Sequence, residues 1–392
     1  MRAKAHVAQA LPAEVVVVVT RGILLPLLLV AASLHAAVLP EDRADALYHS
    51  FSGGGAEISG PSILVRKKFN ESVSATVNHY VDNVSSASID VITTASPYTE
   101  QRKENSLSLD YLNNKTLMNI GYTKSIESDF DAATLSIGFS QDMFGDLTTL
   151  SMGYSQGDNI VRKNGAEFEQ NMDSRSYRLG LTQIMTKDLI MALALETITD
   201  EGYLNNPYRS VRYLDANATR GYSYQGEVYP NTHTSNAIAL RGRYYLQHRA
   251  ALHGSYRYFT DTWGISANTY ELGYTLPYKN DEWIFELSYR YYEQSHADFY
   301  SDLFDYKDAF SFLARDKEMS SFTSQTVGAG ATWEFKRNGV GWIKRGSLNL
   351  DIDYILFKYD DFRDLSVNAP VGEEPLYRFN ATVMRAFLSI WF

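Results

Sequence analysis

The sequence contains one match to a hydrolase motif, Gly153-Tyr154-Ser155-Gln156-Gly157, which has the G-x-S-x-G pattern of a nucleophile elbow. In such an elbow, a sharp turn from a strand to a helix exposes the serine hydroxyl as a nucleophile. Here the motif ends a segment of alternating apolar and polar residues and leads into polar residues without a helical pattern. We therefore predict that Ser155 is not catalytic.

A second candidate for chemistry is the pair His253 and Ser255, which share one face if their segment is a strand. Histidine beside serine can activate the hydroxyl, but two polar residues on one strand face are common without catalysis. The eight histidines show no His-x-x-x-His spacing, and the chain has no cysteine. The sequence therefore predicts no catalytic residues, no metal site and no cofactor.

Charged residues occupy alternate positions of several segments whose other positions are apolar. A strand sends such alternating sets to opposite faces, so these charges are predicted to share the inner face of a sheet. One interpretation is an ion-pair network that stiffens this wall. The other is a permeation path whose charges select the solute. The set is Arg178, Arg241, Arg243, Arg257, Arg290, Glu271, Glu286, Asp351 and Asp353.

The elements that position these charges are strands. After residue 60 no stretch of a dozen residues has a sustained helical period, whereas segments with a period of two recur throughout. In Ser347–Leu356, every even position from Leu348 onward is apolar or Tyr, and the odd positions up to Asp353 are Ser, Asn or Asp. The sequence is therefore that of an all-β protein.

We count fifteen such segments from residue 61 onward and one more between Leu47 and Ile58. Their connections alternate between short ones, such as Asn113-Asn114, and long ones, such as 158–171. Short turns on one rim and long loops on the other are typical of outer-membrane barrels, which in bacteria have even strand numbers. We predict a single transmembrane antiparallel β-barrel of sixteen strands, with fourteen as the alternative, with short periplasmic turns and long extracellular loops.

The first 37 residues differ from the rest and are predicted to be a signal peptide. Arg21 precedes the apolar run Gly22–Leu34, and small residues follow it. This run is too short to span a bilayer as a helix. The block Val15–Val19 fits a signal poorly, and our hypothesis is a translation start near Val19.

The remaining chain is predicted to hold one domain. Residues 38–60 are expected to be an N-terminal segment that can include a first strand, and residues 61–392 the barrel. The chain ends on Phe392, with further apolar residues at a period of two before it. This resembles the C-terminal assembly signal of Gram-negative outer-membrane barrels, so the assembly machinery is an expected partner. The residues of this signal are Met384, Leu388, Ile390 and Phe392.

Charge limits the partners. With 36 Lys and Arg against 46 Asp and Glu, the net charge is −10, which argues against nucleic acid. The segments Ser295–Ser321 and Asp360–Pro375 together hold eleven acids and four bases. We expect these acidic charges to be solvated, the alternative being divalent cations that bridge to lipopolysaccharide. Outer-membrane lipid and lipopolysaccharide are the expected surroundings.

Several short segments have distinctive sequences: Gly53-Gly54-Gly55, Gly60-Pro61-Ser62, Leu64-Val65-Arg66-Lys67, Gly145-Asp146-Leu147-Thr148-Thr149 and above all the small polar stretch from Ser85 to Ser96. They resemble the bacterial family called domain of unknown function 3570, across nearly the whole mature chain. The resemblance implies an outer-membrane barrel without assigned activity and supplies no catalytic residues. The stretch is expected either to fold inward or bind a partner, or to extend the barrel strands. Its residues are Ser85, Ser86, Ser88, Asp90, Thr93, Thr94 and Ser96.

Three functions remain open at this point. The first is a pore in the bacterial outer membrane for small hydrophilic solutes, in which the inward charges set the selectivity. The second is a plugged barrel that anchors a periplasmic or cell-surface partner protein. The third is an outer-membrane hydrolase, for which the sequence offers only Ser155 and His253.

Overall fold

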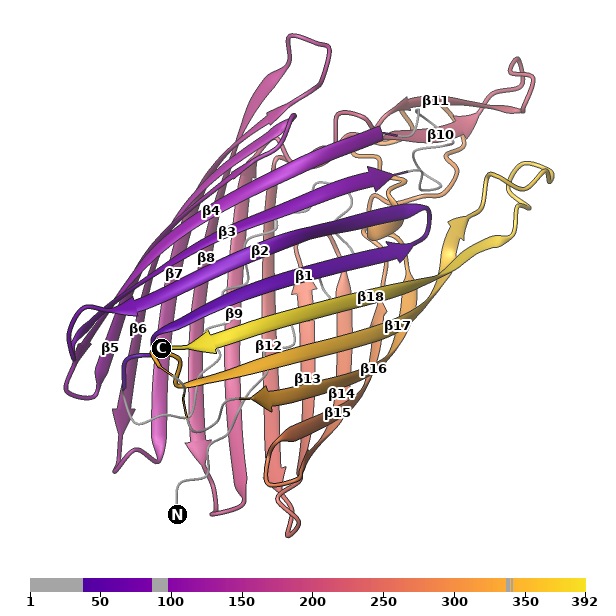
Figure 1. The fold of residues 1–392 in the computed structure, drawn as a ribbon. Coiled ribbons are helices and arrows are strands. Elements are labelled where there is room, and N and C mark those ends of the chain that lie inside the picture. Colours follow the sequence, from indigo (N-terminus) through magenta and orange to yellow (C-terminus); the bar gives the residue numbers. More distant parts are fainter. Residues whose placement is uncertain (1–37, 87–97, 336–338, 340) are drawn as a thin grey trace.

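The computed structural model describes residues 38–86, 98–335, 339 and 341–392. The described chain forms a closed antiparallel barrel of sixteen strands, in which β18 pairs with β1 (Figure 1). The prediction of sixteen strands is confirmed, and the alternative of fourteen is wrong. The barrel strands are β1 (Arg43–Gly53), β2 (Ala56–Lys68), β3 (Val73–Ser86), β4 (Tyr98–Asn113), β5 (Thr116–Ile126), β6 (Phe130–Met143), β7 (Thr148–Arg162), β8 (Glu169–Ile184), β9 (Leu189–Gly202), β12 (Thr232–Tyr245), β13 (Ala251–Asp261), β14 (Ser266–Tyr278), β15 (Trp283–Gln294), β16 (Phe322–Phe335), β17 (Arg345–Arg363) and β18 (Leu376–Trp391).

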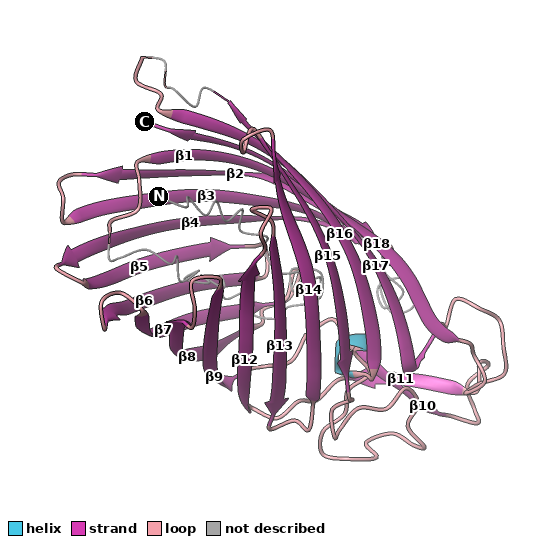
Figure 2. Ribbon diagram, turned by 90° about the horizontal axis from the view of Figure 1, so that it is seen from below, coloured by secondary structure: helices cyan, strands magenta, loops and turns pink. Residues whose placement is uncertain are grey.

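Two short strands lie outside the barrel. β10 (Ser210–Leu214) and β11 (Tyr222–Gly226) form a separate hairpin, so β9 pairs with β12. This hairpin lies among the long loops at one rim (Figure 2).

The first barrel strand begins earlier than the predicted domain boundary. β1 pairs with β18 along its whole length, and the turn Gly54-Gly55 leads into β2. Both glycines have positive φ, 58° and 80°, and a Cβ at Gly54 would lie 2.9 Å from the Phe379 ring. Glycine adopts these dihedral angles without strain, and at position 54 it leaves room for the Phe379 ring. The barrel therefore begins at Arg43 and not at residue 61, which lies inside β2. The predicted signal peptide, residues 1–37, lies outside the described residues.

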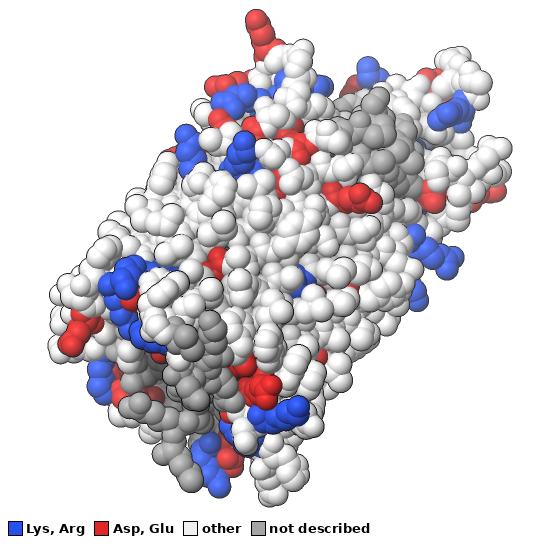
Figure 3. All heavy atoms as spheres, viewed as in Figure 1, with Lys and Arg blue, Asp and Glu red and all other residues white. Residues whose placement is uncertain are grey.

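The two faces of the wall have different compositions. On β17, Leu348, Leu350, Ile352 and Tyr354 are exposed on the outside, and the residues between them face the interior. Figure 3 shows that charged atoms gather at the two ends of the molecule and are sparse in the band between them. A bilayer requires such an apolar band, because lipid tails offer no hydrogen bonds.

Aromatic residues border this band on the outside. Trp283 faces Trp333 on the next strand, with ring centroids 6.2 Å apart, near the short turns. Toward the long loops, Tyr256 lies 5.0 Å from Tyr270. Two such belts are typical of the two membrane interfaces. Outer-membrane barrels have short periplasmic turns and longer extracellular loops, so the rim with the long loops is the extracellular one.

Helical structure is minimal. Within the described part of the chain, no helix is long and apolar enough to cross a bilayer. One turn of 3₁₀ helix, η2 (Lys317–Met319), lies in the loop between β15 and β16.

Candidate functional site: the charged lumen wall and the extracellular cap

The charges predicted to share one face lie on the inner side of the barrel wall. Each alternates with outward residues, as Arg178 does with Tyr177 and Leu179. They come from β8, β12, β13, β14, β15 and β17. Adjacent strands place Glu271 directly opposite Arg290.

Two glycines on β16 make room for acidic side chains. Gly328 pairs with Asp353 and Gly330 with Asp351. A Cβ at either glycine would overlap a carboxylate oxygen of the aspartate opposite it. On the other side of Gly330 lies Glu286 on β15. The carboxylates of β15 and β17 therefore lie over a strand without inward side chains at these positions.

Some inward charges are paired. Arg178 donates from Nε to Oε1 of Glu196 at 2.7 Å, and Arg257 lies 4.0 Å from the other oxygen of Glu196. Arg385 on β18 donates to Asp353 at 2.7 Å. Glu196 and Arg385 are not among the inward charges predicted from the sequence. Both alternate with outward apolar residues, so the same period of two would have found them.

His253 belongs to this wall. Its Nε2 lies 3.6 Å from Glu286 Oε1 and 3.9 Å from Glu271 Oε1. The imidazole covers Gly273, where a Cβ would overlap the ring. His253 thus joins the acidic side chains of β14 and β15.

Three of the five arginines predicted to face inward differ from Arg178 and Arg257. Arg241, Arg243 and Arg290 form no ion pair within 4.0 Å with any residue that the structure describes. Arg241 is exposed to water on the inner face, and Arg243 is half-buried.

Ser155 and His253 are far apart along the wall. Ser155 lies inside the regular strand β7, opposite Ser136 and Ser176, and its side chain is buried. β8, β9 and β12 separate β7 from β13, which carries His253. Four strand spacings of about 4.8 Å place the two residues roughly 19 Å apart along the wall. The structure therefore does not bring them together.

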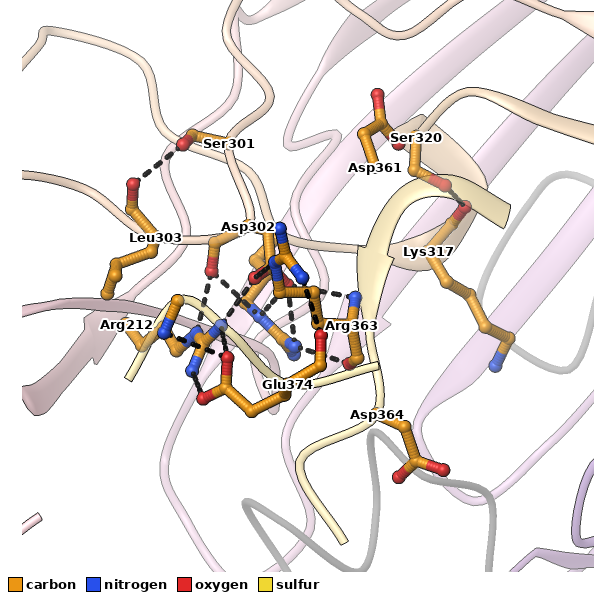
Figure 4. A network of polar contacts seen from close by, with 12 residues as sticks. Arg212, Ser301, Asp302, Leu303, Lys317, Ser320, Asp361, Arg363, Asp364 and Glu374 are labelled. Carbon is orange, nitrogen blue, oxygen red and sulfur yellow. Dashed lines mark hydrogen bonds and ion pairs between the residues drawn. The ribbon is translucent and has the colours of Figure 1, made fainter. Parts of the chain in front are cut away.

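Three long loops form a folded unit, which we call the extracellular cap: residues 203–231, 295–321 and 364–375. Arg212 on β10 is fully buried at its centre. Its Nη1 donates to Glu374 Oε1 at 2.5 Å, its Nη2 donates to the Asp302 carboxylate, and its Nε donates to the Asp302 carbonyl at 2.9 Å (Figure 4). Arg315 also donates to Asp302, at 2.9 Å. One buried guanidinium therefore joins all three loops.

The expectation that the acidic loops are solvated is wrong for three of their carboxylates. Asp302, Asp316 and Glu374 are buried and lie next to arginines of the cap. Burial of a charge is costly without a partner, so the acids and the arginines require each other. This pairing could not be predicted from the sequence, because the partners lie up to 162 residues apart.

The cap packs on the inner wall of the extracellular mouth. The Arg315 guanidinium lies 4.5 Å from the ring centre of Phe362, which is fully buried. Gln294, on the inner side of β15, donates to the carbonyls of Glu318 and Ser320. Beneath Phe362 an inward cluster of apolar residues lines this side of the barrel, and it includes Phe51, Phe322, Ile355, Phe357 and Tyr359.

One group of carboxylates has a geometry that could hold a cation. Ligand atoms of Glu100, Glu127 and Asp129 lie within 4.8 Å of one another at the extracellular ends of β4, β5 and β6. Burial raises the pKa of Glu127 to about 7. Ser128 donates to Glu100 from both its backbone and its hydroxyl.

The C-terminal residues lie at the periplasmic rim. Met384 and Leu388 are exposed on the outside of β18, and Ile390 shares their face. Phe392 follows the strand, and its ring lies 5.8 Å from Trp342 and 5.0 Å from Lys67 Nζ. The predicted assembly signal thus faces the lipid, and its last residue packs at the rim.

The distinctive small polar stretch falls mostly on residues that are not described. Ser85 is exposed at the end of β3, and Ser86 is the last residue of that strand. Ser88, Asp90, Thr93, Thr94 and Ser96 lie outside the described residues.

Comparison with known families matches residues 43–348 to the family model described as protein of unknown function DUF3570. The chain belongs to this family. The resemblance predicted from the sequence is thereby confirmed, and no curated protein matches the sequence.

Among solved structures, a bacterial polysaccharide outer-membrane secretin covers 90% of this chain and 99% of its own, at 7% identity and a TM-score of 0.51. OmpT of Vibrio cholerae covers 89% and 99%, at 11% identity and a TM-score of 0.42. OpdK of Pseudomonas aeruginosa, solved with vanillate, covers 90% and 98%, at 7% identity and a TM-score of 0.42. The first of these similarities supports the fold. With its closed wall, apolar outer band and charged interior, this DUF3570 protein is a β-barrel of the bacterial outer membrane.

Proposed function

We propose that this DUF3570 protein is a selective pore for small hydrophilic solutes, and that its inward arginines favour anionic or zwitterionic ones. The support for this proposal is the inner wall. Its charged side chains keep water-accessible surface, with 27% of Arg257, 38% of Glu271 and 33% of Glu286 exposed. A lumen packed like a protein core would leave such groups dry.

The observation that carries the proposal is the set of arginines without ion pairs. Arg241 and Arg243 lie on one strand, and Arg290 lies three strands further along the wall. Glu271 on β14 lies directly opposite Arg290, and the other inward carboxylates of the set lie on β15 and β17. Such an uneven distribution creates a field across the lumen, and rings or faces of charge select ions in pores generally.

The test is single-channel conductance of the refolded protein in a planar lipid bilayer, with ion selectivity taken from reversal potentials. We expect steady openings, and a shift toward cation selectivity in the variant R241E/R243E. The control is Lys187→Glu, a single charge reversal in a periplasmic turn where the side chain is 90% exposed. A selectivity that R241E/R243E leaves unchanged while it remains folded would refute the proposed lining.

A second candidate is a barrel that anchors a partner and conducts nothing. It is favoured by the cap, because three loops held by one buried arginine form a defined surface at the cell exterior. A folded barrel without conductance would support this candidate. For Ser155 and His253 we propose no catalytic role, in view of their separation along the wall.

A further inference from the structure

Two cations face each other on the lipid side of the wall. Lys358 on β17 is directly opposite Arg378 on β18, and both side chains are exposed. Like charges directly opposite on antiparallel strands destabilise the pair. An anion between them would remove this cost.

Both cations lie at the outer boundary of the apolar band. Ten residues separate Leu348, in line with the tryptophan pair of the periplasmic belt, from Lys358. This corresponds to about 33 Å along the strand and to about 25 Å across the membrane at the usual strand tilt, which is the height of the apolar band. Between them the outward residues of β17 are Leu350, Ile352, Tyr354 and Leu356. Lys358 and Arg378 therefore lie at the level of the outer-leaflet headgroups.

Within the part of the chain that the structure describes, no carboxylate forms an ion pair with either cation. Asp360 follows two residues after Lys358, but neither cation forms an ion pair within 4.0 Å with Asp360 or any other described carboxylate. Elsewhere at this rim the pattern is different: Arg162 lies 2.9 Å from both Asp131 and Glu169.

The backbone under the two cations is held firmly. The next residues inward, Phe357 and Phe379, are also opposite each other and stack on the lumen side at 4.5 Å. β1 ends at Gly53, opposite Ala381, so Arg378 has no third strand beside it. The stacked rings order the backbone beneath the two cations, and both cationic side chains are open on the lipid side.

We propose that Lys358 and Arg378 bind a phosphate group of an outer-leaflet lipopolysaccharide, whose acyl chains then lie along the outward Tyr354 and Leu356. Charge complementarity and the height in the membrane both indicate this lipid. Arginine binds phosphate through two parallel hydrogen bonds, and lysine adds a point charge. A soluble phosphate would gain nothing from the apolar surface below.

The first test is binding of purified lipid A to the detergent-solubilised protein, with enzymatically dephosphorylated lipid A as the comparison. A basic residue near an anionic surface contributes about fivefold in affinity, so we expect K358Q/R378Q to bind lipid A about 25-fold more weakly. The same variant should bind the dephosphorylated lipid as the natural chain does. The control Lys187→Gln removes one charge from the periplasmic turn and should change neither affinity.

A second measurement separates the site from general charge effects. In neutral detergent, K358Q relieves repulsion and should raise the urea midpoint of unfolding, whereas with saturating lipid A it should lower the midpoint relative to the natural chain. Unchanged affinity in K358Q/R378Q, an equal loss in K187Q, or displacement of lipid A by inorganic phosphate at millimolar concentration would each overturn the proposal.

Discussion

The buried guanidinium of Arg212 is expected to hold the three loops of the extracellular cap together as one unit. Replacing Arg212 by Met retains much of its apolar stem and removes its charge and its donors. Glu374 then remains buried without its guanidinium partner, while Asp302 retains Arg315 at 2.9 Å. Breaking a buried pair in this way costs about 3–5 kcal/mol, and we take the lower end because one partner survives.

A loss of about 3 kcal/mol raises the equilibrium constant for opening of the cap by about 100-fold. Hydrogen–deuterium exchange followed by mass spectrometry measures this directly on peptides from the three loops. We expect faster exchange in 203–231, 295–321 and 364–375 together, with the barrel strands unchanged. The control is Arg220→Met, because Arg220 is exposed in the same loop. Faster exchange confined to residues 210–214 would show that the guanidinium does not couple the loops.

The pair of Arg212 and Glu374 also makes the stability of the cap depend on pH in the acidic range. Burial alone would raise the pKa of Glu374, but hydrogen bonds from Arg212 and the Gly372 N–H lower it below its usual value. A lowered pKa stabilises the folded cap above the ordinary Glu pKa of about 4.3, and this contribution disappears as the pH falls. After correction for the intrinsic pH dependence of amide exchange, we expect opening of the cap to increase below about pH 4 in the natural chain, and this increase to be weaker in R212M.

Three further predictions concern other parts of the molecule. Burial and the Asp316 carboxylate raise the pKa of Glu227 to about 7, so its contribution to cap stability is complete below the usual Glu pKa and declines as the pH rises to about 7. In Glu227→Gln, hydrogen exchange of the cap, corrected for intrinsic rates, should no longer depend on pH in this range. A pH profile identical to that of the natural chain would contradict this prediction. Gly330→Ala places a methyl group against the Asp351 carboxylate, and urea unfolding should show a loss of about 1–3 kcal/mol; an unchanged midpoint would mean that the side chain moves freely aside. Trp391→Ala removes a ring over which the guanidiniums of β1 and β17 lie at 5.8 and 4.0 Å, so we expect a loss of about 1–2 kcal/mol in the same assay; Phe at this position should recover most of it.

The barrel itself was predictable because alternation along a strand is a local property. Leu348 to Leu356 already separate the lipid face from the lumen face, since successive side chains point to opposite sides. The same alternation predicts that Arg241 and Glu271 both lie on the lumen face. The number of strands followed from counting these segments. The predicted start of the barrel at residue 61 was too late, because β1 and the glycine-rich turn after it precede that residue.

Other features depended on residues far apart in the chain. Arg212, Asp302 and Glu374 come from three loops, and nothing near each residue indicates that it is buried with the others. The position of the Asp351 carboxylate over Gly330 and the pairing of Lys358 with Arg378 both depend on strand register. A shift of one residue would place each of these side chains on the opposite face of the wall. The sequence by itself determined the wall and its two faces, because burial in a strand follows local alternation. Only the tertiary structure decided which charges meet, because pairing depends on register and on loops that fold over the mouth.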